Sequence, residues 1–296
     1  MNKQSAAFLS IVSNSFLIIL KLTAGLLIGS ISVISEAIHS SMDLLASFIA
    51  FFSIKKASKA ADDEHPFGHG KYENLSGFVE AMLIFLAAAF IIFEAIKKII
   101  YGSTIETFAA GLIVMFISAV VNLVISAALF KISKRENSIA LEADAMHLLT
   151  DVITAAGVFL GLLIVKVTNL TIIDPITAII VALLIVKTSI NLTKRSIKDL
   201  VDSKLPDEDI KKIVKVIKSH DEIRGYHRLR TRNCGPKKEV DIHLSINEEL
   251  SFVEAHNLCS KIEEDIRTIF PNSYILIHPE PVQKIPSSNK ITYRNI

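Results

Sequence analysis

Six long apolar segments are the feature of this 296-residue sequence that most restricts its fold. Each is long enough to cross a bilayer as a helix, which takes about 20 mostly apolar residues. The composition agrees, because 51% of the residues are hydrophobic, more than is usual for a soluble enzyme. The first segment has a long apolar core with no small-residue cleavage site after it, so we interpret it as a retained helix. We expect spans at residues 6–28, 31–54, 75–96, 105–130, 139–165 and 172–192.

The distribution of lysine and arginine predicts how these spans are oriented. Loops on the cytoplasmic side of a membrane protein are enriched in both residues. One side of the predicted bundle has only Lys97, Lys98 and Lys166. We therefore expect both termini to lie in the cytoplasm. The richer side carries Lys3, Lys55, Lys56, Lys59, Lys71, Lys131, Lys134, Arg135, Lys194, Arg195 and Lys198.

After residue 202 the sequence becomes charged, with short alternating patterns. A helix is expected from about 206 to 219, strands at 226–232 and 239–246, and a last strand at 273–278. Ser251 and Glu254 form a capping box that opens a second helix, which Pro271 ends. The order α-β-β-α-β predicts a small α+β domain, ferredoxin-like or metallochaperone-like, with its helices on one face of an open sheet. We thus expect a six-helix all-α transmembrane bundle at 1–202, a cytoplasmic domain at 203–283 and a disordered tail at 284–296.

Two histidine–aspartate pairs lie inside predicted spans. His39 and Asp43 are on the second span and His147 and Asp151 on the fifth, and a spacing of four places each pair on one helix face. Ionisable groups inside a membrane usually mark a functional site. Together the pairs offer the four nitrogen and oxygen ligands of a closed Zn²⁺ site. A polar contact between helices is the alternative, but two copies of the same pattern favour a metal. Four other polar residues are kept outside this site: Glu36, Glu80, Asp144 and Asn14.

A second candidate metal site follows the second span. Asp62, His65 and His69 give a compact set of nitrogen and oxygen ligands, and Pro66 and Gly68 prevent a regular helix. The backbone between them can therefore wrap around an ion. An acidic exposed loop with two incidental histidines is the alternative interpretation.

The cytoplasmic domain holds the remaining histidines. A histidine on a strand is more often a surface or core residue than a ligand, but four of these can converge at one sheet edge. That candidate site consists of His227, His243, His256 and His278 with Glu280. His220 is left over at a helix end, where a cap-type interaction is sufficient. Cys234 and Cys259 form no CxxC motif and are expected to be buried or incidental thiols.

Several of these motifs together resemble the cation diffusion facilitator family of metal/proton antiporters, in particular its bacterial ferrous-iron/zinc efflux branch. The similarity covers residues 5–283. The runs that carry it are Ile31-Ser32-Val33 to Asp43, the loop 62–72, Glu142-Ala143-Asp144-Ala145-Met146-His147-Leu148-Leu149-Thr150-Asp151, Leu229-Arg230-Thr231-Arg232 and Ile277-His278-Pro279-Glu280-Pro281.

The resemblance implies roles for all three candidate sites. The first is the transport site, the loop is a zinc site, and the third is a binuclear site through which the cytoplasmic domains of a homodimer pack. A salt bridge at the cytoplasmic hinge of the dimer maps onto Lys71 and Asp202. Two positions depart from the pattern. The nearest bacterial relatives usually have aspartate at the position of His39, and a histidine there resembles the zinc-selective members. Glu280 stands where aspartate is commoner.

The function expected is efflux of a divalent cation from the cytoplasm by proton antiport with alternating access. Zn²⁺ is favoured, with Cd²⁺ and Fe²⁺ as further substrates, and zinc bound to the cytoplasmic domain is expected to regulate transport. A passive divalent-cation channel and a metal sensor are the alternatives. An enzyme is not expected, because an intramembrane zinc protease needs H-E-x-x-H and no histidine here precedes a glutamate. The expected setting is the inner membrane of a bacterium, and the net charge of +2 gives no reason to expect nucleic acid as a partner.

Overall fold

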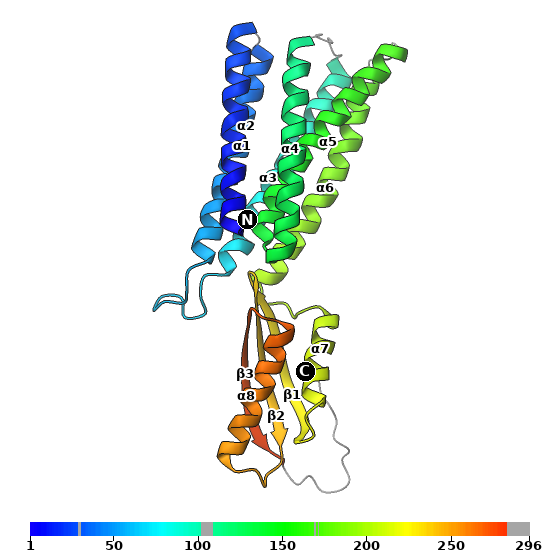
Figure 1. Ribbon diagram of the computed structural model, residues 1–296. Helices are drawn as coiled ribbons and strands as arrows, with labels where there is room; N and C mark the ends of the chain where they lie inside the picture. The colour runs from blue at the N-terminus through cyan, green and yellow to red at the C-terminus, as the bar shows by residue number, and fades with distance from the viewer. Residues whose placement is uncertain (29–30, 102–108, 169, 171, 283–296) are drawn as a thin grey trace. The chain divides into compact units, whose positions relative to one another are not determined.

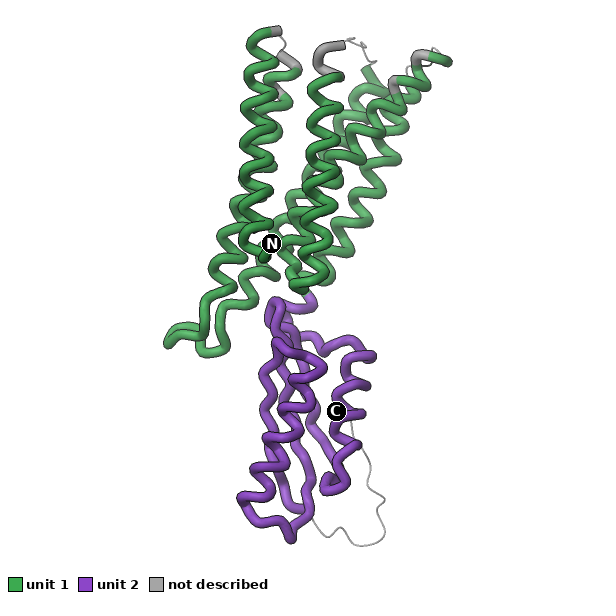
Figure 2. Tube along the Cα trace, in the orientation of Figure 1, with its two compact units in different colours: residues 1–197 green, residues 198–296 purple. Residues whose placement is uncertain are grey.

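The computed structural model describes residues 1–28, 31–101, 109–168, 170 and 172–282. The chain forms two compact units, Met1–Ile197 and Lys198–Ile296 (Figure 2). The first corresponds to the apolar part of the sequence and the second to the charged part. The expected tail at 284–296 lies outside the described residues, as do residues 105–108 of the fourth predicted span.

Six helices build the first unit, and each corresponds to one of the predicted spans (Figure 1). Within the described residues, all six are long and apolar enough to cross a membrane. Most extend beyond the predicted segments, because polar residues at the ends of the spans continue the helices. Their bounds are α1 Lys3–Ile28, α2 Ile31–Ala57, α3 Lys71–Tyr101, α4 Ala109–Glu136, α5 Ile139–Thr168 and α6 Ile173–Leu200.

Small residues let these helices approach one another closely. Ala140 and Ala145 of α5 are fully buried against Ile54 of α2 and Leu129 of α4. Such packing is typical between membrane helices, where small side chains allow tight van der Waals contact. Large apolar side chains instead cover the outside of the helices, as a lipid-facing surface requires. Examples are Phe8, Phe16, Phe52, Phe90, Phe93 and Phe116, all exposed in the isolated chain.

The second unit has the predicted order α-β-β-α-β. Its strands pair in the order β1-β2-β3, with β1 antiparallel and β3 parallel to β2. The capping box is confirmed, since the Ser251 hydroxyl accepts from the Glu254 backbone and the Glu254 side chain accepts from the Ser251 backbone. The elements are α7 Asp207–Lys218, β1 Ile223–Cys234, β2 Lys237–Ile246, α8 Phe252–Ile269 and β3 Ser273–Pro281.

Both helices of this unit pack on the same face of the sheet. Ile242 and Leu244 of β2 belong to a single core with Ile217 of α7 and Ile262 of α8, and all four are fully buried. Because side chains alternate along a strand, His243 must lie on the opposite face. Among the residues that the structure describes, one face of the sheet is therefore free of helices, as predicted, and the histidines of the strands lie there.

Candidate metal sites

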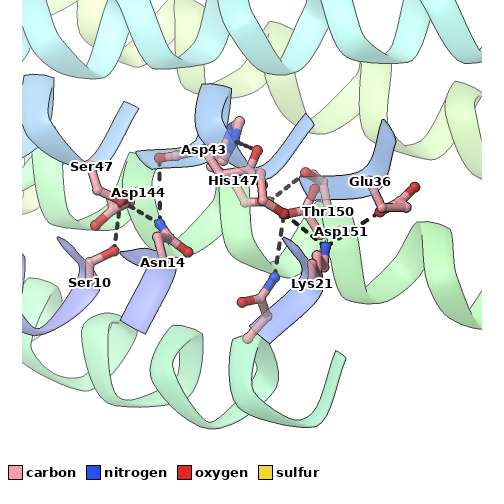
Figure 3. Close-up of polar contacts among 12 residues, drawn as sticks. Ser10, Asn14, Lys21, Glu36, Asp43, Ser47, Asp144, His147, Thr150 and Asp151 are labelled. Carbon is pink, nitrogen blue, oxygen red and sulfur yellow. Dashed lines mark hydrogen bonds and ion pairs between the residues drawn. The ribbon is translucent and has the colours of Figure 1, made fainter. Parts of the chain in front are cut away.

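The four predicted residues of the membrane site come together between α2 and α5. Candidate ligand atoms of His39, Asp43 and Asp151 lie within 4.8 Å of one another. His147 joins them, because its Nε2 donates a hydrogen bond to Asp43 Oδ1 over 3.0 Å. Each helix contributes one histidine and one aspartate, and the spacing of four places both on one face of the helix. Figure 3 shows Asp43, His147 and Asp151 side by side.

His147 and Asp43 have about the spacing of two zinc ligands. Ligand atoms around Zn²⁺ are separated by about 3.3 Å, from metal–ligand bonds of about 2.0–2.1 Å. The 3.0 Å between His147 and Asp43 is close to that separation. Both side chains are buried, at 8% and 5% exposure, whereas His39 is exposed in the isolated chain. A nitrogen and an oxygen ligand are thus held inside the helices before any ion binds.

Polar residues from neighbouring helices hold the cluster in place. Asn122 of α4 donates to Asp151 Oδ2 over 3.4 Å. Asn14 of α1 donates to the Asp43 carbonyl over 3.4 Å and to Ser47 over 2.8 Å, and Ser47 donates to Asp144 Oδ1 over 3.1 Å (Figure 3). Asn14 and Asp144 lie outside the site predicted from the sequence, and Asn122 is not among the predicted residues. Asn122 can be recognised in the sequence as an amide side chain within an apolar span.

Two further acids that were set aside are also placed by the structure. Glu80 of α3 is fully buried and accepts a hydrogen bond from Ser76 over 3.0 Å. Glu36 of α2 pairs with Lys21 of α1 over 3.4 Å. Lys21 itself is buried, with 7% exposure, and belongs to none of the sites predicted from the sequence. It can be recognised in the sequence as a single lysine within the first predicted span.

The three residues of the loop site also converge. Asp62 Oδ2 lies 3.3 Å from His69 Nε2, and Asp62 Oδ1 lies 3.4 Å from His65 Nδ1. Gly68 turns the chain between the histidines with a φ of 83°, a left-handed conformation that favours glycine. The His65 backbone N–H donates to Asp62 and lowers the pKa of that carboxyl. The carboxylate is therefore ionised and ready to bind a cation.

The tautomer of His69 fits a metal as well. Its Nδ1 donates to the Ala60 carbonyl over 3.1 Å, which leaves the lone pair of Nε2 directed at Asp62 and His65. A histidine ligand usually has its second nitrogen fixed by such a hydrogen bond. The residues of this loop thus fit a resident zinc ion.

In the second unit, histidines from three strands form a row across the free face of the sheet. The strand register pairs His227 with His243 and His243 with His278. His243 Nδ1 donates to Glu280 Oε1 over 2.8 Å, and His227 Nε2 lies 3.3 Å from Glu280 Oε2. The bond from His243 lowers the pKa of Glu280. Glu280 thus reaches the row, and His227, His243 and Glu280 alone offer three ligand atoms within 4.8 Å.

His256 does not join this group within one chain. It is exposed on α8, the helix that covers the opposite face of the sheet. His220 does not act as a simple cap but donates to Asp265 of α8 over 3.0 Å. Asp202 accepts from Arg232 over 3.2 Å. The predicted bridge between Asp202 and Lys71 would join the two units and stays a prediction.

Comparison with known proteins identifies both units. The family model described as the cation efflux transmembrane domain matches residues 7–201, and that of the cation efflux protein cytoplasmic domain matches residues 205–282. An uncharacterized transporter of Synechocystis is 31% identical over 89% of this chain and 86% of its own length. The cation-efflux pump FieF of Pectobacterium atrosepticum is 30% identical over 93% of this chain and 91% of its own length. The metal-bound C-terminal domain of the CzcD transporter from Thermotoga maritima is 24% identical and matches 25% of this chain and 87% of its own length, with a TM-score of 0.24.

Proposed function

Because this chain belongs to the cation diffusion facilitator family of cation efflux transporters, we propose that it exports Zn²⁺ from the cytoplasm in exchange for protons. The observation that carries this proposal is the cluster of His39, Asp43, His147 and Asp151 between membrane helices. Ligands outside the helices could belong to any zinc protein. Ligands on two spanning helices are what a transporter needs.

The donor set favours zinc among divalent metals. Imidazole suits Zn²⁺ better than the harder Mn²⁺ and Mg²⁺, which prefer oxygen ligands. Zinc also has no geometric preference from d-electrons, which suits a site that opens to each side in turn. Cd²⁺ and Fe²⁺ accept the same donors and are proposed as weaker substrates.

Proton exchange follows from the same residues. A metal binds the neutral imidazole and the ionised carboxylate, so metal and protons compete for the site. The imidazole nitrogens of His39 and His147 can bind either a proton or the metal, so these two residues are proposed as the proton carriers. Alternating access would follow if α2 and α5, which hold the ligands, rock against the other helices.

The cytoplasmic unit is proposed to bind zinc and regulate transport as part of a homodimer. His227, His243 and His278 with Glu280 would hold this zinc on the free face of the sheet. His256 lies on α8 and would join this proposed set only across the homodimer. Zinc there would tighten the dimer and bias the membrane helices, which is a coupling between two distinct sites. Both termini are proposed to face the cytoplasm, as the positive charges predict, in the inner membrane of a bacterium.

Metal uptake into proteoliposomes with an imposed pH gradient tests the proposal. Wild-type protein is expected to take up Zn²⁺ faster than Cd²⁺ or Fe²⁺ and to move protons in the opposite direction, as a trapped pH dye reports. His39→Asp replaces a nitrogen by an oxygen ligand and should shift the preference away from Zn²⁺. His220→Gln, in the other unit, serves as the control. Zinc uptake that ignores the pH gradient would instead support a passive channel.

A further inference from the structure

A buried lysine lies beside the proposed transport site, the cluster of His39, Asp43, His147 and Asp151. Lys21 is within α1, where Lys3 is the only other charged residue, and it is 7% exposed. A charge inside a membrane helix is costly and is retained where it serves a function. Lys21 is not a metal ligand, because an ammonium group has no lone pair to donate.

The contacts of Lys21 connect it to the helix that carries His39 and Asp43. Its Nζ donates to Ser40 Oγ over 2.8 Å and lies 3.4 Å from Glu36 Oε2. Ser40 is itself buried, at 4% exposure. Figure 3 shows Lys21 and Glu36 at one end of the group that contains Asp151. The ammonium is thus held at a defined place by α2.

From this position the charge of Lys21 acts on the ligands themselves. Its positive charge attracts the carboxylates of both Asp43 and Asp151. Together with Glu36, these carboxylates form a group of three acids, and Lys21 is the cation held among them. The lysine stabilises the carboxylates when no metal is bound. The same charge repels a divalent cation that enters.

We propose that Lys21 is a fixed positive charge of the transport site, which lowers its affinity for divalent cations so that the bound ion can leave. This inference rests on the proposed function, since it assumes that the cluster binds the transported ion. Conduction and transport require binding that is strong enough for entry and weak enough for release. A unit charge about 6 Å from a divalent ion weakens binding by about tenfold even at the dielectric constant of water.

Zinc binding to the full-length protein, measured by calorimetry, tests this role. All variants carry His69→Ala and His243→Ala, which weaken the loop and cytoplasmic sites. Lys21→Met removes the charge and keeps an unbranched apolar chain, and Lys21→Arg keeps the charge. Lys98→Met is the matched control, because it breaks a different ion pair of the same unit, in which Lys98 Nζ lies 3.1 Å from Asp174 Oδ2.

Lys21→Met is expected to bind Zn²⁺ about tenfold more tightly or better and to lower the maximal rate of zinc transport. Lys21→Arg and Lys98→Met should keep the wild-type affinity. If Lys21→Met is not recovered folded, Lys21→Gln, which retains a donor for Ser40, carries the same expectation. A folded neutral variant with unchanged or weaker affinity would overturn the inference, since a structural role alone does not tighten binding.

A separate variant distinguishes this failure from failure of the proposed function. In the same background, Asp151→Asn should abolish the zinc binding that remains. If Asp151→Asn removes binding and Lys21→Met does not tighten it, only the role of Lys21 is wrong. If wild-type binding in this background does not depend on Asp151, the proposed function and the role of Lys21 are overturned together.

Discussion

Replacing Asp43 by asparagine separates metal binding from folding at the proposed transport site, which consists of His39, Asp43, His147 and Asp151. Asp43 is 5% exposed and accepts a hydrogen bond from His147 Nε2 over 3.0 Å. Asparagine has the same shape, and its side-chain oxygen can accept the same hydrogen bond. What the variant loses is the negative charge that would face the metal.

The two effects differ in size. A hydrogen bond to a charged group contributes about 1.5–3 kcal/mol and one to a neutral group about 0.5–1.5, so stability should fall by only about 1 kcal/mol. Four ligands bind structural zinc with about 10–16 kcal/mol, or about 3 kcal/mol each, so losing one costs about a hundredfold in affinity. We therefore expect Asp43→Asn to fold normally and to lose zinc transport.

Two measurements on the same preparation check this prediction. Thermal unfolding in detergent reports stability, and zinc uptake into proteoliposomes reports the zinc concentration that gives half-maximal rate. Asp174→Asn is the matched control, because Asp174 is a buried acid of α6 that pairs with Lys98 outside the cluster. The reasoning is refuted if folded Asp43→Asn transports zinc at the wild-type concentration dependence, or if Asp174→Asn impairs uptake equally.

Two further predictions concern the cytoplasmic unit. The pKa of Glu280 is lowered by the hydrogen bond from His243, so Glu280 stabilises the fold above its ordinary pKa of 4.5 and loses this effect only as the pH falls below it. Glu280 therefore stays ionised at neutral pH as a candidate zinc ligand, so Glu280→Gln should lower the zinc affinity of this unit at about pH 7, as calorimetry would show. Ile242 is fully buried, so Ile242→Ala should destabilise the unit by about 2–5 kcal/mol. Thermal unfolding measures this loss, with the exposed Val253→Ala as the control.

Local patterns in the sequence were sufficient to predict the helices and strands of this protein. Six apolar runs predicted six helices, because a backbone that crosses lipid must satisfy its own hydrogen bonds. Ser251 and Glu254 predicted the start of α8, because a capping box is formed by residues three apart. The two pairs spaced by four needed only the helical period to share a face. Each of these features depends on residues close together in the chain.

Contacts between distant residues could be decided only by the tertiary structure. The pairing of His147 with Asp43 depends on how α2 packs against α5, and the positions of Lys21 and Asn122 depend on α1 and α4. The row of His227, His243 and His278 requires the strand register, which includes an irregularity between His227 and Arg230. His256, which the sequence grouped with them, lies on the helix of the opposite face. Sequence periodicity assigns a side chain to a face of its own element, whereas the packing of helices and strands determines which faces meet.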